Sequence, residues 1–297
     1  RALGFVFAIP CAYFAARGYI TRPLALRLGV LFTAGGCQGL VGWWMVKSGL
    51  EMPKNEYEIP RVSPYRLAAH LTSAFAIYTG LLWTTLSIRD TLPAALSPTA
   101  SPQMLAGAKA VRSLVLPLSV LIGVTAISGA FVAGLDAGHA YNTFPLMGDS
   151  LIPEEYWGNS VYPFESILKN TFENTAAVQF HHRVLAVTTL CSVTSVWAMT
   201  RGMAMPPGTQ TIMNCMLAMT YTQVALGITT LLTYVPVSLG SAHQAGALTL
   251  MSFAVAALHS LRGAGLGNPA ALPIATAAAA AAGLGGGARI YESVMNS

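Results

Sequence analysis

Long apolar runs separated by short polar segments account for most of this chain. Six of them occupy residues 24–46, 66–88, 111–134, 180–200, 210–233 and 240–261. A helix needs about 20 mostly apolar residues to cross the hydrocarbon core of a bilayer. The pattern therefore predicts an all-α integral membrane protein with six full spans.

Both ends of the chain depart from this pattern. Residues 2–16 are apolar but too few for a full span, and Arg1 precedes them without an initiator methionine, signal peptide or transit segment. We therefore expect the chain to begin inside a helix whose earlier part is lost. From Asn268 onward the chain is rich in Ala and Gly, including alanines at every position of 277–282. This tail is either a weak further hydrophobic segment or a flexible end, and we expect a flexible end.

Composition agrees with a membrane protein. Hydrophobic residues make up 54% of the chain and charged residues only 9%, whereas about a quarter of a soluble domain is charged. The net charge is +5, but the charges are scattered over the loops, which argues against nucleic acid as a partner. The cysteines, Cys11, Cys37, Cys191 and Cys215, include no CxxC pair and give no disulfide or zinc signal.

The loops differ in charge when they are assigned alternately to the two sides of the membrane. One side carries nine basic residues against two acids, and the positive-inside tendency assigns it to the matrix or cytoplasm. The other side includes residues 135–178, a segment too long for a simple connector, which we expect to fold over whatever lies below it. The charged residues on the basic side are Arg17, Arg22, Arg27, Arg89, Lys109, Arg112, Arg201, Arg262 and Arg289, with Asp90 and Glu292.

A short internal repeat relates two pairs of helices. The segment 38–42 (QGLVG) is echoed by 223–227 (QVALG), and in each case the next helix begins with a histidine, His70 or His243. The first copy carries 12 more residues between Gln and His than the second, consistent with its polar loop around residues 51–60. Parallel repeats of this kind are common in membrane proteins.

The second copy of the repeat has a further histidine, His182, at the start of an earlier helix. It lies 61 residues before His243. Applied to the first copy with its insertion, this spacing places a fourth histidine just upstream of Arg1. The repeat therefore predicts a four-histidine protein from which this chain has lost one ligand.

The three histidines His70, His182 and His243 lie about one turn inside helices that enter from the same side, so their rings should share a depth. Ionisable groups within spans are costly and indicate function, and neutral imidazole is a common ligand of heme iron. Two histidines on facing helices of a bundle can hold one heme between them. Interfacial histidines bonded to backbone or water are the alternative, but three at matched depth favour heme ligation.

The other histidines receive different interpretations. His181 points about 100° away from His182 around the helix, so only one of the two can face the core. His259 should approach the opposite membrane face, about 24 Å from His243 along its helix, as an interfacial residue. His139 lies in the outer segment, where either a substrate contact or simple exposure fits, and exposure is the expectation.

Several segments closely resemble the heme A synthase family, in its mitochondrial and alphaproteobacterial branch. The most specific are residues 128–138 and 141–148, which resemble the outer-loop signature of that family. The resemblance runs from about Arg1 to Arg262 and does not cover the tail. The further matching segments are 38–43, 61–63, 65–70, 179–180, 182–183 and 221–223.

The resemblance implies two pseudo-repeated four-helix bundles, the first incomplete here. Their expected extents are residues 1–110 for the substrate half, 111–262 for the cofactor half and 263–297 for the tail. It implies an oxidoreductase that converts a methyl group of heme O to the formyl group of heme A by successive hydroxylation. His182 and His243 would be the axial ligands of a resident heme b, and His70 would bind the iron of the substrate heme.

Two departures from the family bear on activity. The family's proposed catalytic glutamate lies upstream of residue 1, and the neutral Gln179 occupies the equivalent position before His182. Position 181 is His, where many relatives have Asp. If residues 1–297 were the whole polypeptide, we would expect it to keep the heme b site and to lack synthase activity.

The resemblance also implies a location and partners. It places the protein in the mitochondrial inner membrane, with the bacterial plasma membrane as the alternative. The partners would be heme O, the lipid bilayer, an electron donor not identified by the sequence, a second copy of the chain, and heme O synthase or oxidase assembly factors. A bis-histidine electron-transfer cytochrome and a membrane transporter are the competing functions.

Overall fold

A computed structural model describes residues 2–50, 60–90, 100–158 and 166–265 of the chain. The predicted flexible tail and most of the predicted polar insertion around residues 51–60 lie outside these residues. Within them the structure contains helices, turns and an isolated bridge between Met147 and Ser150, and no strand.

Six helices in the described residues are long and apolar enough to cross a membrane. Their positions confirm the six predicted spans, and the chain is an all-α, multi-pass integral membrane protein. A shorter apolar helix, α1, covers Ala2–Ala16. The six long helices are α2 (Arg22–Gly49), α3 (Pro64–Arg89), α4 (Pro102–Gly134), α6 (Thr175–Thr200), α7 (Thr209–Leu232) and α8 (Val237–Ser260).

The helix α4 begins well before the predicted span at residue 111. Ser101 caps it by accepting a hydrogen bond from the backbone N–H of Met104 at 3.1 Å, and Pro102 occupies its first turn. These start signals lie outside the apolar window, so hydropathy alone missed them. The expected boundary between residues 110 and 111 consequently falls inside α4, and the division into two halves stays a prediction.

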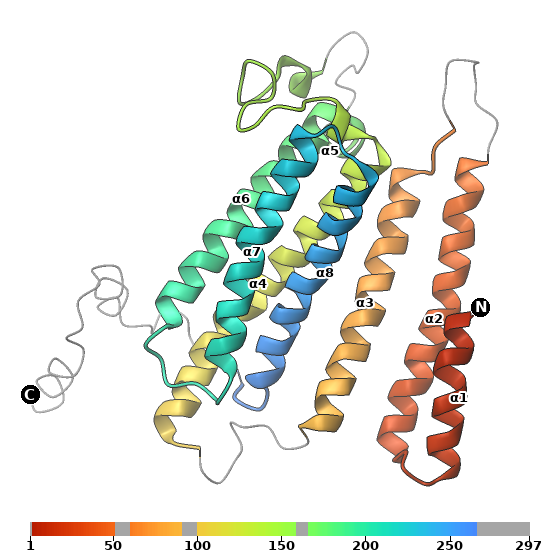
Figure 1. Ribbon diagram of the computed structural model, residues 1–297, viewed down its shortest axis with the longest axis vertical. Coiled ribbons are helices and arrows are strands. Elements are labelled where there is room, and N and C mark those ends of the chain that lie inside the picture. Colours follow the sequence, from red (N-terminus) through yellow and green to blue (C-terminus); the bar gives the residue numbers. More distant parts are fainter. Residues whose placement is uncertain (1, 51–59, 91–99, 159–165, 266–297) are drawn as a thin grey trace, which may run out of the picture.

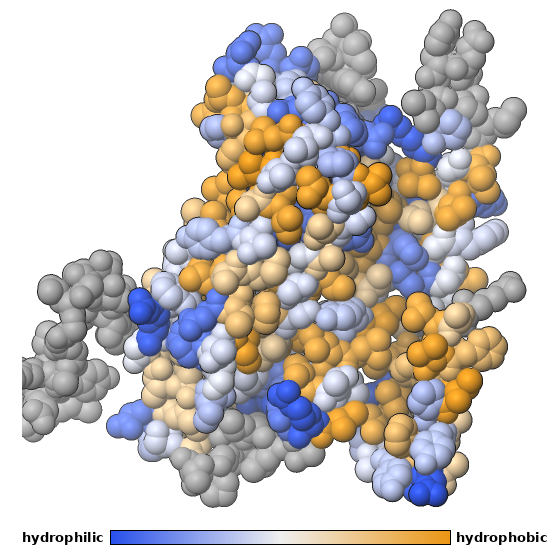
Figure 2. All heavy atoms as spheres, in the orientation of Figure 1, coloured by the Kyte–Doolittle hydropathy of each residue, from blue (hydrophilic) through white to orange (hydrophobic). Residues whose placement is uncertain are grey.

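Three short helices in the outer segment were not predicted. They are η2 (Ala137–His139), η3 (Glu154–Trp157) and α5 (Ile167–Glu173). Figure 1 shows this segment at one end of the bundle formed by α4, α6, α7 and α8. In Figure 2 hydrophobic residues gather over the middle of the helices, and hydrophilic residues are more frequent at the two ends.

The bundle of α4, α6, α7 and α8 is solidly packed in its inner half, the half farther from the outer segment. Buried residues from the four helices form one cluster there, including Val115, Val193, Met213 and Leu250. Met213 and Val193 have no exposed surface. This core fills the space between the four helices in their inner half, and the cavity described below lies in the outer half.

The helix α3 is attached to α8 by polar contacts at two levels. The Tyr78 hydroxyl lies 2.8 Å from the Ser252 hydroxyl, and the Ser87 hydroxyl lies 3.1 Å from His259 Nε2. Arg262 contacts His259 Nδ1 and donates to the backbone carbonyl of Asp90. His259 lies at the inner end of α8, as expected, but it is only 2% exposed because α3 covers it.

Candidate functional site

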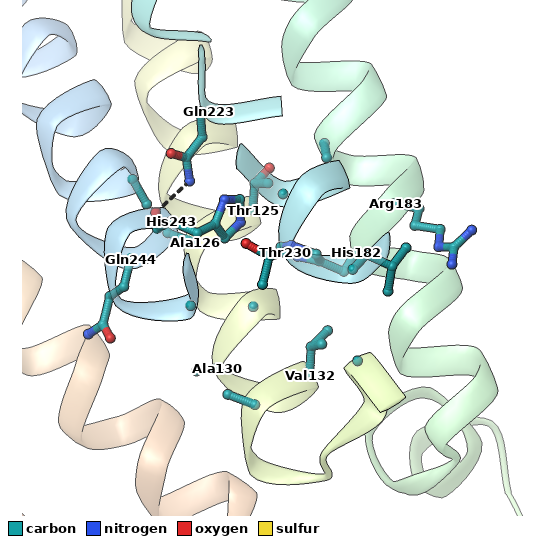
Figure 3. Close-up of a pocket in the computed structure, with 18 of the residues that line it drawn as sticks. Thr125, Ala126, Ala130, Val132, His182, Arg183, Gln223, Thr230, His243 and Gln244 are labelled. Atoms are coloured by element: carbon teal, nitrogen blue, oxygen red, sulfur yellow. Dashed lines mark hydrogen bonds between the residues drawn. The ribbon is translucent and has the colours of Figure 1, made fainter. Parts of the chain in front are cut away.

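A cavity of about 370 Å³ lies between the outer parts of α4, α6, α7 and α8, with one wall formed by α3. His182 on α6 and His243 on α8 both line it. Figure 3 shows their imidazole rings projecting toward one another from the two helices. The walls are otherwise mainly apolar, as in sites for large, flat, hydrophobic ligands.

Each of the three predicted histidines packs against a glycine of a neighbouring helix. A Cβ atom on Gly42 would lie 2.9 Å from Cε1 of His70, and one on Gly227 would lie 2.9 Å from Cε1 of His243. A Cβ atom on Gly129 would lie 3.2 Å from Cε1 of His182. The absence of a side chain at these positions lets each ring lie directly on the adjacent helix.

The repeated glutamines act on the same histidines. Gln38 Nε2 donates to the backbone carbonyl of His70 at 2.8 Å, and Gln223 Nε2 donates to that of His243 at 2.8 Å. The repeat found in the sequence is thus a structural unit, in which glutamine fixes the backbone and the glycine four residues later accommodates the ring.

The ring nitrogens of His182 have distinct roles. Its Nδ1 lies 2.7 Å from the Ser128 hydroxyl, which also lies 2.7 Å from the carbonyl of Thr125. Because the hydroxyl has one proton and donates it to that carbonyl, Nδ1–H of His182 donates to the serine oxygen. This tautomer leaves a lone pair on Nε2, which is the form that binds a metal.

The Nδ1 atoms of His70 and His243 are buried without a hydrogen-bond partner. Buried polar atoms are rarely left unpaired, and those that are call for a functional or structural explanation. The structure brings His182 and His243 to one cavity, whereas His70 does not line it and instead packs against α2. A cluster of three or more metal-binding side chains does not occur in the described part of the chain.

The outer segment is tied to the start of α6 by Gln179 and Arg183. Gln179 is 3% exposed and donates to the carbonyls of Ala137 and Tyr141 at 2.9 and 3.1 Å. Arg183 donates to the carbonyls of Tyr141 and Leu146, each at 3.1 Å. These bonds hold the segment across the outer end of the cavity.

A second attachment joins the outer segment to the turn between α7 and α8. Asn142 Nδ2 donates to the carbonyl of Leu231 at 2.8 Å, and Gly138 packs against Val235. Val235 has a φ of 54°, a conformation that β-branched residues rarely adopt. Both Gly138 and Val235 line the cavity, so this strained turn forms part of its outer end.

The remaining outer histidines differ in their surroundings. His139 is exposed, as expected from the sequence, and it also lines the cavity, so a substrate contact stays a prediction. His181 faces the outer segment, where its Nε2 lies 3.1 Å from the hydroxyl of Tyr156. Of the adjacent pair, His182 alone lines the cavity.

Within the outer segment, Tyr141 donates a 2.7 Å hydrogen bond to the carboxylate of Glu155. Partial burial, together with this bond and the negative charge of Glu155, raises the pKa of Tyr141 to about 12. The same hydrogen bond lowers the pKa of Glu155 below its ordinary value. The pair is therefore a neutral phenol and a carboxylate throughout the physiological range.

The residues that support the histidines were only partly visible from sequence. Ser128 and Gly129 belong to the segment that carries the family resemblance, but their contacts with His182 join residues far apart in the chain. The repeat gave a signal for Gly42 and Gly227. Ser73 donates to Gln38 Oε1 at 2.5 Å. The repeat did not reveal this residue, because Ser73 lies three residues after His70, whereas Gly246 lies three residues after His243.

Fold and site together define a multi-pass helical membrane protein with paired histidines in an interhelical cavity. Residues 1–255 match the COX15-CtaA family, described as cytochrome oxidase assembly protein. Given this match and the relatives below, the chain belongs to the heme A synthase family, as its sequence segments predicted. No solved structure matches the chain.

The similar curated proteins come from plants, animals and bacteria. The chain is 53% identical to "Heme A synthase COX15" of Arabidopsis thaliana over 88% of the chain and 55% of that relative. It is 44% identical to "Heme A synthase COX15" of Homo sapiens over 88% of the chain and 61% of that relative. It is 39% identical to "Heme A synthase" of Nitrosospira multiformis over 88% of the chain and 68% of that relative.

The glycine contacts predict a difference between two substitutions on α2. Gly42→Ala places a methyl group against the ring of His70 and should lower stability by about 1–3 kcal/mol, as overpacking does. Gly39→Ala meets no atom within 4 Å and should be neutral or slightly stabilising. Thermal unfolding of both variants in one detergent checks this, and equal melting temperatures would contradict the proposed contact.

The pair of Tyr141 and Glu155 predicts how local opening of the outer segment depends on pH. The lowered pKa of Glu155 stabilises the closed segment above the ordinary carboxyl pKa, and this contribution is lost as pH falls through the lowered value. The raised pKa of Tyr141 stabilises it below about pH 10, and this contribution is lost as pH rises through about 12. Protection factors from hydrogen exchange should be constant between these limits.

Tyr141→Phe should weaken the acid-side dependence, because a backbone hydrogen bond also lowers the pKa of Glu155. It should lower the protection of the segment about fivefold at neutral pH, equivalent to about 1 kcal/mol. The expected loss of protection is small because Glu155 is largely exposed to solvent. An unchanged protection factor in the variant would show that the hydrogen bond does not hold the segment closed.

Proposed function

We propose that this chain is the greater part of the catalytic unit of a heme A synthase, which oxidises a methyl group of heme O to the formyl group of heme A. The observation that carries the proposal is the pair His182 and His243, which project toward one another across a mainly apolar cavity. The relatives named heme A synthase support the reaction.

The two histidines fit the axial ligands of a resident heme b. Ser128 holds His182 in the tautomer whose Nε2 can bind iron, and Gly129 and Gly227 leave space for both rings. A heme ligated by two histidines supplies one-electron transfer when bound, because its iron has no open coordination position. In this proposal Gln179 and Arg183 keep the outer segment over the cavity and exclude water.

His70 would bind the iron of the substrate heme on the other side of α3. Its ring lies against Gly42 of α2, and its Nδ1 is buried without a partner. Two successive hydroxylations would convert the methyl group to a gem-diol, and loss of water would leave the formyl group. Each hydroxylation removes two electrons from the methyl carbon and adds an oxygen atom, so the reaction requires an oxidant and an oxygen source as well as an electron donor, none of which these residues supply.

The six spans support a membrane location, and the relatives from animals, plants and bacteria support the choice of membrane. We place the protein in the mitochondrial inner membrane, with the bacterial plasma membrane as the alternative. A second copy of the chain, heme O synthase and oxidase assembly factors are the proposed protein partners. A transporter that couples flux to buried carboxylates is disfavoured, because α2, α3, α4, α6, α7 and α8 contain no Asp or Glu.

The ligand assignment is tested on detergent-purified protein by reduced-minus-oxidised spectra and pyridine hemochrome analysis. His182→Ala and His243→Ala should each abolish a b-type signal, because either change leaves the iron with one axial ligand. His181→Ala is the matched control and should keep the signal, because the ring of His181 contacts Tyr156 and does not line the cavity. Protein purified without heme, from cells that supply it, would overturn the assignment and favour a transporter.

The reaction is tested on the full-length polypeptide that contains these residues, by analysis of extracted hemes after incubation in air with heme O and a reductant. Heme A should form, and His70→Ala should lower its yield at least tenfold while the b-type spectrum remains, since the substrate iron loses a ligand. An intact b-type spectrum without any oxidation of heme O would instead identify an electron-transfer cytochrome.

A further inference from the structure

A groove on the outside of the bundle, between the inner parts of α6 and α7, is separate from the histidine cavity. None of its lining residues lines that cavity. Polar side chains in it lie on exposed or half-buried surfaces of spanning helices. The lining residues are Trp197, Arg201, Gln210, Asn214, Leu217, Ala218 and Tyr221.

The polar groups of the groove are arranged around Asn214. Trp197 Nε1 and Gln210 Nε2 both donate to Asn214 Oδ1, at 2.7 and 3.1 Å. Because indole N–H is only a donor, this network orients the asparagine so that its amide protons remain for another acceptor. Polar groups facing hydrocarbon are costly unless a ligand satisfies them.

Arg201 adds a cation at the inner end of the groove. Its guanidinium carbon lies 4.7 Å from the centre of the Trp197 ring, which orients the side chain. In the described part of the chain no carboxylate forms an ion pair with it. An arginine at the end of a spanning helix often only reaches toward water, but this one is stacked at the mouth of a polar groove.

We propose that the groove binds an anionic phospholipid of the inner leaflet. The phosphate would lie on Arg201, whose planar group can donate two parallel hydrogen bonds to phosphate oxygens. The amide protons of Asn214 would donate to an ester oxygen, and an acyl chain would lie along Leu217, Ala218 and Tyr221. The basic excess of this membrane side, predicted from the loops, favours an anionic headgroup.

Native mass spectrometry of the detergent-purified protein can test the proposal with phosphatidylglycerol and phosphatidylcholine of identical acyl chains. The protein should retain phosphatidylglycerol about tenfold more strongly. Arg201→Gln should weaken that retention about fivefold, as expected for loss of one basic residue, and Arg201→Lys should weaken it less. Asn214→Leu should weaken retention of both lipids.

Arg89→Gln is the matched control, because Arg89 lies at the inner end of another spanning helix, is exposed and is paired with Asp90. It should leave lipid retention unchanged. Equal loss in Arg89→Gln and Arg201→Gln, or equal retention of the two lipids, would overturn the proposal in favour of general surface charge.

Two further outcomes would overturn it in other ways. Glycerol phosphate that binds as tightly as the diacyl lipid would identify a soluble-anion site. A changed subunit number in Arg201→Gln, with lipid retention unaltered, would identify an interface between copies of this chain. Both are read from the same spectra.

Discussion

The close contact of a histidine ring with a glycine on a neighbouring helix is the constraint on which the site depends. Spanning helices gain little from the hydrophobic effect between themselves, so small residues and interhelical hydrogen bonds decide where they approach closely. At His243 the glycine Gly227 allows the approach, and Gln223 fixes the backbone of the histidine from the same helix face. One short segment of α7 therefore sets both the position of the ring and the spacing of the helices.

The two copies of this unit differ in one detail with a physical consequence. Ser73 donates to Gln38 Oε1 in the first copy, so the amide is held at both ends. Gly246 occupies the equivalent place in the second copy, and a Cβ atom there would overlap Gln223 Oε1, which is buried without a partner. The second glutamine is thus held at one end only, beside the cavity that it lines. The two copies therefore share one arrangement of glutamine, glycine and histidine, but the glutamine that supports His70 has one more hydrogen bond than the glutamine that supports His243.

Hydropathy was sufficient to predict the six spans, because about 20 apolar residues leave few alternatives to a spanning helix. It failed at the start of α4, where Ser101 and Pro102 extend the helix beyond the apolar window. The repeat and the family segments predicted the histidines and their glutamines. They could not show that His182 bonds to Ser128, or that His259 is covered by α3, since such contacts join residues far apart in sequence. Apolar runs in the sequence show where a spanning helix lies, but they do not show which helices pack against it.

The position of α3 connects the two sites proposed for the hemes. Leu67, Leu71 and Phe75 recur at intervals of four residues, so they share one face of α3, and that face lines the cavity of His182 and His243. His70 instead packs against α2. The hydrogen bonds between Tyr78 and Ser252 and between Ser87 and His259 fix α3 on α8. A single helix, about 10 Å wide, thus forms a wall of the cavity and carries the ligand proposed for the substrate heme, so a rotation of α3 must alter both sites at once.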